Sequence, residues 1–463
     1  MTDDPKIERP FFINGGSIYL SCRTVENKYY FANGFTGTPR FQENVEGFTP
    51  RKLQIRDGQP VDIVGMPTRE AIEAAPVLQA KELYTLLDTH IWKYIDAPNI
   101  DRELFVYYIL FTWFYPKVNT CPYLRFLADT GNGKSRMQRV IGDLCFYPIR
   151  AGGASTPAGV MRIKERWHGT LLIDEADLRA SDATNELTKY LNLGFEKGQY
   201  FIKSDKDQPK EQDIFDPYCP KVIAMRRPFQ DNATEGRLLS FTPKETTRTD
   251  IPFVLPGSYN NEVEQLRGII TRFVLANWEK VDGEKGIDIR DMPIEPRLKQ
   301  IAIPLSIILQ LFPDGEIRFR EYLKERQKEV RKIRAASLEG MVFNAVLEWV
   351  QDQPDIKGHL TAKDIYERAG LKSPNAASRI LHSIGFVTEI VKDGKTIRVM
   401  AVPDQKTWDA IIQRYYYSET DERKDCPVQL KGSRWVTQVT QVTLLEDELN
   451  SKNNSAPEAP HAL

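Results

Sequence analysis

Apolar runs alternate with amphipathic stretches between residues 122 and 242 of the chain. Apolar runs of the length of a buried strand occur at 122–128, 169–176 and 220–228. Between them, residues 133–145 and 182–195 carry apolar side chains at helical spacing. Strands that alternate with helices predict an α/β fold, in which a parallel sheet is flanked by helices on both faces.

The pattern changes several times along the chain and predicts six consecutive segments: 1–77, 78–121, 122–242, 243–337, 338–405 and 406–463. In the first segment, aromatic and polar residues alternate between Gly, Pro and Asn, which predicts a small β-rich domain. The second and fourth segments show helical periods. The polar end of the last segment has the composition of a disordered tail.

Residues 338–405 predict a separate small domain. Three predicted helices precede a strand pair at 386–402, whose turn is the Asp393-Gly394 dipeptide. The third helix has Ser373 at its N-cap position and Gly385 at its C-terminal end. Three helices followed by a hairpin are typical of a winged-helix domain.

The composition fits a globular protein with several cores. Of its 463 residues, 41% are hydrophobic and 27% are charged, and the net charge is −1, so a surface for nucleic acid must be local. The five cysteines lie far apart without zinc or redox spacing, which indicates reduced thiols in a cytoplasmic protein. The most apolar run, 106–115, is shorter than the ~20 residues that span a bilayer, so we expect no membrane contact.

Residues 127–136, LADTGNGKSR, match most of a phosphate-binding loop that follows a strand. Such a loop needs inward-pointing backbone N–H groups, a lysine for the outer phosphates and a hydroxyl for Mg²⁺. Ala128 replaces the first glycine of the pattern, at the strand end, where the loop is least pressed against phosphate. The candidate ATP-binding residues are Asp129, Thr130, Gly131, Asn132, Gly133, Lys134, Ser135 and Arg136.

Two acids end the second predicted strand, and the first of them lies forty residues after Lys134. Asp174 suits the acid that holds the water shell of Mg²⁺ from the neighbouring strand, so Ser135 and Asp174 are the expected metal residues. Glu175 would then polarise the attacking water. The alternative interpretation is a strand that runs into the acidic cap of a helix.

Two arginines are candidates for contacts with the γ-phosphate. Arg226 lies at the end of the third predicted strand, near the expected position of that phosphate. Arg237 follows it, and an arginine at a subunit edge can stabilise transition-state charge in a neighbouring site. The alternative for Arg237 is a surface ion pair, which contributes about 0 to 1 kcal/mol.

The motifs ADTGNGKS, LLIDEAD and DNATEGR, in this order, resemble the AAA+ ATPases. More narrowly, residues from about 100 to 312 look like the helicase-type ATPases of phages, plasmids and other mobile elements. The resemblance implies a homo-oligomeric ring, a hexamer, with ATP and Mg²⁺ between subunits, Arg237 acting on a neighbour's nucleotide, and DNA in the pore. It also implies a helical lid within 243–337, in which Arg297 is a second nucleotide sensor. The Met225-Arg226 pair departs from this class, which often has Asn or Thr there.

Candidate DNA contacts lie in two places. Residues 198–220 interleave aromatic side chains with Lys203 and Lys206, which suits a hairpin that grips a strand in a pore. Acids in the same stretch nearly cancel this charge, so a solvated surface hairpin is the other interpretation. In the winged-helix segment, Arg379 on the third helix would contact the major groove of DNA, and Lys392 and Lys395 on the hairpin would contact its phosphates. Winged helices also dock proteins.

These features predict an ATP-dependent DNA motor, a replicative or initiator helicase of a mobile element. A second hypothesis is an ATP-driven switch that loads or remodels a partner protein, with the winged helix as its anchor. A phosphotransferase ranks below both, because no separate acid for an acceptor stands out.

Overall fold

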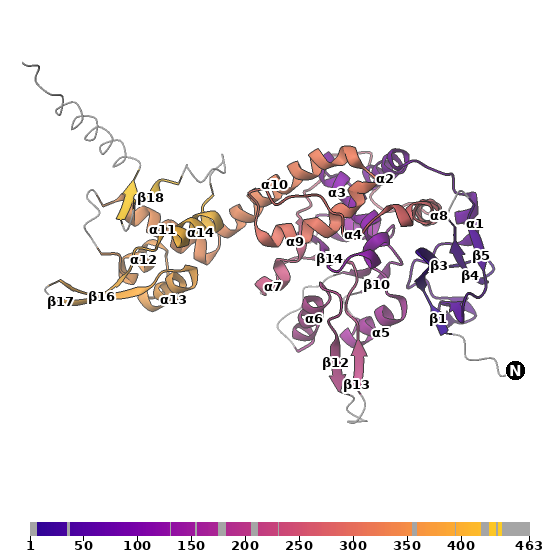
Figure 1. The fold of residues 1–463 in the computed structure, drawn as a ribbon, viewed down its shortest axis with the longest axis horizontal. Coiled ribbons are helices and arrows are strands. Elements are labelled where there is room, and N and C mark those ends of the chain that lie inside the picture. The colour runs from indigo at the N-terminus through magenta and orange to yellow at the C-terminus, as the bar shows by residue number, and fades with distance from the viewer. Residues whose placement is uncertain are drawn as a thin grey trace, which may run out of the picture. The chain divides into compact units, whose positions relative to one another are not determined.

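The computed structural model describes residues 7–34, 38–129, 131–152, 155–174, 182–204, 212–229, 231–353, 359–393, 395–417, 426–431 and 434–437. The chain divides into two compact units, residues 1–323 and 324–463. Each unit has its own hydrophobic core, and Figure 1 labels the elements of both. The finer division into six segments stays a prediction.

A five-stranded parallel sheet lies at the centre of the first unit. Its strands, from edge to edge, are β10 (Ile149–Ala151), β11 (Leu171–Ile173), β14 (Lys221–Met225), β9 (Tyr123–Leu127) and β15 (Leu238–Phe241). The predicted α/β fold with a parallel sheet is confirmed, and the three predicted strands are β9, β11 and β14. The sequence analysis predicts neither β10 nor β15.

The expectation that the acid-ended strand neighbours the strand of the phosphate loop is wrong. β14 lies between them, paired with β11 through Ile173 and Ile223 and with β9 through Ala224 and Phe126. The carboxyl ends of β11 and β9 are therefore about 10 Å apart, two strand spacings rather than one. Asp174, directly after β11, can contact a residue of α4, the helix after the loop, only where α4 crosses over β14.

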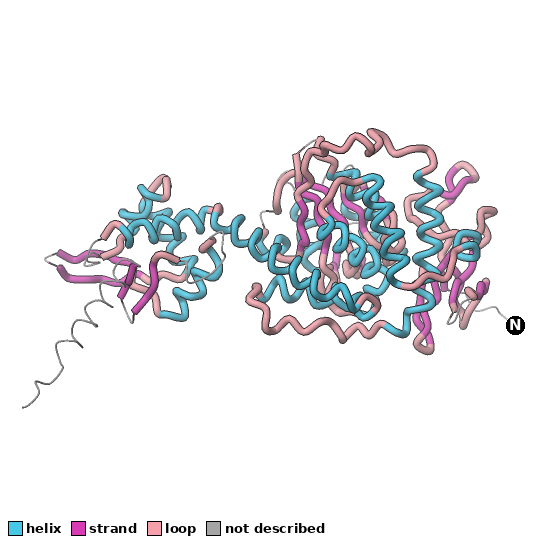
Figure 2. The backbone as a smooth tube through the Cα atoms, turned by 90° about the horizontal axis from the view of Figure 1, so that it is seen from above, coloured by secondary structure: helices cyan, strands magenta, loops and turns pink. Residues whose placement is uncertain are grey.

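Helices cover both faces of this sheet, as predicted (Figure 2). α3 (Asn99–Phe114) and α4 (Lys134–Gly142) pack together on one face, where the Phe105 ring lies edge-on to Phe126 with 5.6 Å between centroids. α6 (Asp182–Leu193) is on the other face, where the Tyr123 hydroxyl donates a hydrogen bond to Leu191 O at 2.7 Å. Successive side chains of β9 point to opposite faces, so this strand is buried on both.

The first 66 residues are rich in strands, and they are joined to the central sheet. The strands are β1 (Ile7–Arg9), β2 (Phe11–Asn14), β3 (Ser17–Arg23), β4 (Tyr29–Asn33), β5 (Arg40–Gln42), β6 (Phe48–Pro50), β7 (Ile55–Arg56) and β8 (Gln59–Pro60). Val64 then forms an antiparallel bridge with Ile149 of β10. Arg150 N donates to Ile63 O at 3.1 Å. The N-terminal region thus continues the edge of the central sheet.

The remaining elements of the first unit are mostly helices. They are α1 (Arg69–Ala74), α2 (Ala80–Tyr94), α5 (Pro157–Trp167), α7 (Asn232–Glu235), α8 (Tyr259–Asn277), α9 (Pro296–Leu305), the start of α10 (Glu316–Ala335), and the hairpin β12 (Phe201–Ser204) with β13 (Gln212–Phe215). α1 and α8 touch at Gly268, where an added Cβ would lie 2.4 Å from the Ala71 backbone. No helix in the described ranges is both long and apolar enough to cross a bilayer.

The second unit follows the predicted order of three helices and a hairpin. Its elements are α11 (Leu338–Gln351), α12 (Ala362–Arg368), α13 (Pro374–Ile384), β16 (Thr388–Asp393), β17 (Lys395–Met400), α14 (Gln405–Tyr415), β18 (Val428–Lys431) and β19 (Arg434–Thr437). Ser373 Oγ caps α13 by accepting from Ala376 N at 3.3 Å, and Gly385 ends it with φ of 116°. Gly394 lies outside the described residues. The winged-helix assignment itself stays a prediction.

Replacement of Trp408 tests whether the two cores are separately stable. Trp408 is fully buried in the second core, where it contacts the rings of Phe343 and Trp435. Trp408→Ala should lower the free energy of unfolding of the second unit by about 3–5 kcal/mol. In scanning calorimetry this change should move one of two transitions.

Trp278→Ala is the matched control, because Trp278 is buried against Phe114 in the first unit. It should move the other transition. A single transition that both variants shift equally would contradict two independent cores.

Candidate nucleotide-binding site

The segment between β9 and α4 has the backbone geometry of an anion-binding loop. Gly131 and Gly133 have left-handed φ values of 95° and 78°, which cost a residue with a Cβ roughly 1–2 kcal/mol. An added Cβ would meet no atom within 4 Å at either position, so conformation and not crowding requires glycine. Gly133 is the N-cap of α4 and supplies no side chain, so the first helical N–H groups are available to an anion.

Lys134, Ser135 and Asp174 carry the chemistry expected beside this loop. Ser135 Oγ donates a hydrogen bond to Asp174 Oδ1 at 3.0 Å, so the structure brings the two expected metal residues together. Lys134 is 6% exposed, and across the described ranges its ammonium group has neither a hydrogen bond nor an ion pair. A phosphate oxygen beside the ammonium group would give it a charged partner.

Gln138 holds α4 against two neighbouring strands, although the sequence analysis does not single it out. It is 5% exposed, and its amide nitrogen donates to Ile173 O at 2.6 Å and to Val222 O at 2.9 Å. Ile173 directly precedes Asp174, so this contact sets the distance between the helix of Ser135 and the strand of Asp174. A polar residue on the buried face of a predicted helix is the signal that could have identified it.

Of the other residues predicted around the phosphates, some are described by the structure and others are not. Arg226 is exposed directly after Met225, which pairs in register with Leu127 at the end of β9. It therefore lies at the carboxyl edge of the sheet, between the loop and the acid-ended strand. Asp129 and Asn132 lie in the loop. Thr130 and Glu175 lie outside the described residues.

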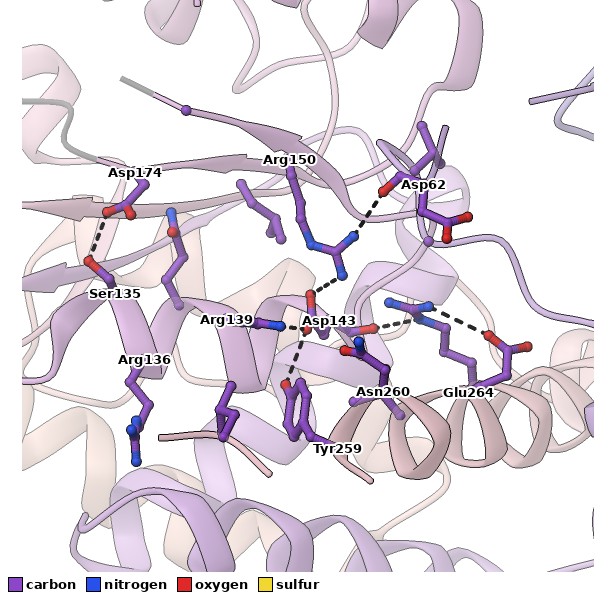
Figure 3. Close-up of a pocket in the computed structure, with 18 of the residues that line it drawn as sticks. Asp62, Ser135, Arg136, Arg139, Asp143, Arg150, Asp174, Tyr259, Asn260 and Glu264 are labelled. Atoms are coloured by element: carbon purple, nitrogen blue, oxygen red, sulfur yellow. Dashed lines mark hydrogen bonds and ion pairs between the residues drawn. The ribbon is translucent and has the colours of Figure 1, made fainter. Parts of the chain in front are cut away.

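A cavity of about 1060 Å³ extends away from Ser135 and Asp174. Figure 3 shows these two residues at one end, Asp62 and Glu264 at the other, and Asp143 between them. Small-molecule sites typically have volumes of about 300–1,000 Å³, so this space suits a ligand as large as a nucleotide. The walls come from α4, β10, the segment 253–257, α8 and the N-terminal residues 62–66.

Asp143 organises the middle of the cavity wall. It is 1% exposed, and its carboxylate accepts from Arg150 Nη2 at 2.6 Å and from the Tyr259 hydroxyl at 3.1 Å. Burial and the charge of Asp143 raise the pKa of Tyr259, which keeps the hydroxyl protonated as a donor. Arg139 Nε lies 3.8 Å from the same carboxylate, and its side chain is half exposed. One buried acid thus holds basic groups from α4 and β10 along the cavity.

Arg136, a predicted nucleotide contact, instead holds the segment before α8. Its guanidinium group donates to the carbonyl oxygens of Pro252 and Phe253. The same segment presents the Phe253 side chain, which is 99% exposed, and Val254, which is 79% exposed. Both residues line the cavity. Arg136 therefore positions an apolar rim and is not aimed at the phosphate loop.

The N-terminal region, for which the sequence analysis predicts no chemistry, forms the far wall. Arg267 of α8 donates from Nε to Asp143 O at 2.7 Å, and its Nη2 is buried without a partner. A Cβ on Gly65 would lie 2.5 Å from that Nη2, so glycine is required for Arg267 to fit. Glu264 of α8 accepts from Thr68 N at 2.6 Å. These contacts depend on how distant segments pack, which no local sequence pattern shows.

Arg237 and Arg297 lie at the opposite end of the sheet from the loop. Arg237 O accepts from Tyr123 N at 3.0 Å, at the amino end of β9. Arg297 lies beside Gly236, where an added Cβ would be 2.9 Å from Arg297 Nε. The structure therefore does not bring Arg297, the expected second sensor, to the phosphate loop of its own chain.

The predicted DNA contacts are only partly described. Lys203 on β12 forms an ion pair with Glu186 at 2.8 Å, which offsets its charge. Arg379 on α13 and Lys392 on β16 are both exposed. Lys206 and the side chain of Lys395 lie outside the described residues. DNA binding by any of them stays a prediction.

Known proteins give limited comparisons. No family model and no curated protein matches the chain. The NrS-1 C-terminal region in its apo form is 13% identical, with 82% of this chain and 95% of that chain covered and a TM-score of 0.39. SCCmec type IV Cch, described as an active helicase, is 10% identical over 88% of this chain and 80% of that chain, with a TM-score of 0.42. JCV helicase is 14% identical over 53% and 61%, with a TM-score of 0.24. At these values no family is assigned.

Replacement of Gln138 tests the link between α4 and the strand ends. Gln138→Leu keeps a similar volume but leaves the carbonyl oxygens of Ile173 and Val222 without their donor. The free energy of unfolding should fall by about 1–3 kcal/mol, as measured by urea denaturation. Gln54→Leu, at an exposed position of the same unit, should change it by no more than about 0.5 kcal/mol. Equal stabilities of the two variants would contradict the assigned role.

Proposed function

We propose that the chain is an ATP-dependent DNA motor, a replicative or initiator helicase of a mobile genetic element. It hydrolyses ATP at the subunit interfaces of a homo-oligomeric ring, a hexamer. The observation that supports this most directly is the contact of Ser135 with Asp174 beside a glycine loop whose lysine is buried and unpaired. These are the groups that MgATP needs, held together across an intervening strand.

The residues at the loop fit the triphosphate and its metal. The N–H groups that follow Gly131 and Gly133 face an anion at the start of α4, and Lys134 contacts the outer phosphates. Ser135 and Asp174 hold Mg²⁺, directly or through its water shell. When bound, Mg²⁺ neutralises charge on the phosphate oxygens during transfer.

The rest of the cavity suits the nucleoside. It continues from Ser135 along α4 to α8 and residues 62–66. The exposed Phe253 ring at its rim offers an apolar face for a base, and Arg139 offers a half-exposed cation. Because Asp143 holds Arg150 and Tyr259 in place, this wall is built before ligand arrives.

Hydrolysis is assigned to one acid and two arginines. Glu175 takes a proton from a water molecule while the oxygen of that water attacks the γ-phosphorus. The bond from the γ-phosphorus to the oxygen of the ADP leaving group then breaks. Arg226, exposed between the loop and Asp174, lies where it can contact the γ-phosphate. Arg237 acts from the neighbouring chain, and its position at the amino end of β9, away from its own loop, supports this.

The hairpin β12–β13 is the proposed contact with single-stranded DNA. Figure 1 shows it projecting from the sheet. Tyr200, Ile202 and Ile214 are 58%, 59% and 57% exposed on it. Because Lys203 forms an ion pair with Glu186, its charge contributes less to DNA binding than the stacking of bases on Tyr200 does. Movement of the hairpin after hydrolysis then shifts the strand.

One observation favours the ATP-driven switch as the second candidate. Val387, before β16, and Ile390, on β16, are 64% and 65% exposed. Apolar side chains on the hairpin of the second unit suit a partner protein better than a phosphate backbone. In that case the second unit docks the protein that the ATPase loads or remodels.

ATP hydrolysis with and without single-stranded DNA tests the motor. The wild-type rate should rise several-fold with single-stranded DNA of any sequence. Lys134→Ala should lower the rate about 100-fold or more, because it removes a charge that contacts the transferred group. Lys52→Ala, at an exposed position of the same unit, should retain the wild-type rate.

The outcomes separate the two candidates. A rate that ignores single-stranded DNA but rises with one protein partner or one duplex site would favour the switch. Equal rates for wild type and Lys134→Ala would contradict ATP hydrolysis at this loop.

A further inference from the structure

Arg237 and Arg297 lie on the same aromatic ring. The guanidinium carbon of Arg237 is 5.4 Å from the centroid of Phe195, and that of Arg297 is 5.8 Å from it. Phe195 itself is 5% exposed. Arg297 comes from α9, which lies against Gly236 directly before Arg237. Two segments distant in sequence therefore place two positive charges side by side.

Among the described residues, no carboxylate lies within ion-pair distance of either arginine, although the charges of Asp231 and Glu196 act on Arg237 from farther away. Arg237 donates to Asn192 Oδ1 and Ala233 O, and its Nε is buried without a partner. Arg297 donates to Gln300 Oε1 at 2.8 Å. Within the described part of the chain, neither arginine forms an ion pair. Two adjacent like charges repel each other, and an anion between them would convert that repulsion into binding.

The carboxylate of the same turn does not fill this role. Asp231 Oδ2 accepts hydrogen bonds from Thr234 Oγ1 at 2.7 Å and from Asn192 Nδ2 at 2.7 Å. Burial and the charge of Arg297 lower the pKa of Arg237, and the charges of Asp231 and Glu196 offset only part of this effect. The two guanidinium groups are thus held in place by neutral groups.

The pair cannot serve the phosphate loop of its own chain. Arg237 lies at the amino end of β9, beside Tyr123, whereas the loop begins after Leu127 at the carboxyl end. Four residue steps of a strand separate these ends by about 13 Å. A head-to-tail ring brings one face of each subunit to the opposite face of the next, and so can bring this pair to a second copy's loop.

We infer that Arg237 and Arg297 form one anion site, which binds the triphosphate held by the phosphate loop of a second copy of this chain. The inference rests on the proposed ATPase and assigns Arg297 to the neighbour's nucleotide in place of a sensor role in its own chain. Each planar guanidinium group can donate two hydrogen bonds to phosphate oxygens. A nucleic-acid strand would need cations spaced along many phosphates.

Mixtures of inactive variants test which chain supplies Arg297. The first mixture combines Lys134→Ala with Arg297→Ala in equal amounts. It should regain about a quarter of the wild-type ATPase rate. At about one interface in four, a chain with an intact loop has a neighbour in which both Arg237 and Arg297 are intact. Neither variant alone should exceed about a hundredth of that rate.

The second mixture combines Arg237→Ala with Arg297→Ala. It should stay inactive, because every chain then presents an incomplete pair to its neighbour. If Arg297 acted on its own chain, the two results would be exchanged: this mixture would regain activity and the first would not. That exchange would overturn the inference while leaving the ATPase intact.

Further outcomes are also decisive. Arg290→Ala is the matched control, since Arg290 is 90% exposed and pairs locally with Asp288; it should keep the wild-type rate. An Arg297→Ala protein with wild-type ATPase but weaker binding to single-stranded DNA would mark a nucleic-acid site and overturn the inference. Absence of ATPase in the wild type would overturn the proposed function and the inference together. Melting temperatures within a few degrees of wild type establish that the variants are folded.

Discussion

The proposed nucleotide site depends on one contact: Ser135, which follows β9, meets Asp174, which follows β11, although β14 lies between these two strands. The hydrogen bond between them, at 3.0 Å, is possible because Gln138 anchors α4 to the carbonyl oxygens of both β11 and β14. The same placement aims the start of α4, with its uncapped N–H groups and Lys134, at the space in front of Asp174. The proposed phosphate site at this edge of the sheet therefore depends on the position of one helix.

Positive charge without a partner occurs at both ends of the sheet. At the carboxyl end, Lys134 is buried and unpaired in the described structure, and at the amino end Arg237 and Arg297 share Phe195. A single chain cannot bring these ends together, but a head-to-tail neighbour can. The N-terminal region has a separate role, because its backbone pairing with β10 makes residues 62–66 a wall of the cavity. The walls of the cavity thus come from segments spread over most of the first unit.

Local sequence patterns predicted the phosphate loop, its lysine and hydroxyl, the acid-ended strand and the parallel sheet, because each is encoded by neighbouring residues. The order of the strands was not predictable in this way, since pairing of β14 between β9 and β11 is a long-range choice. For the same reason, the sequence does not show that Gln138 spans two strands or that Gly65 makes room for Arg267. The resemblance implies that Arg297 is a second nucleotide sensor, and only its packing against Gly236 shows that it lies beside Arg237.

The most direct test is titration calorimetry of the wild-type protein with a non-hydrolysable ATP analogue, in the presence and absence of Mg²⁺. If the glycine loop, Lys134, Ser135 and Asp174 form one site, the analogue binds with Mg²⁺ at one molecule per chain, and binding weakens markedly when Mg²⁺ is removed. Absence of binding to the assembled protein, or binding that Ser135→Ala and Asp174→Ala leave unchanged, would contradict the account.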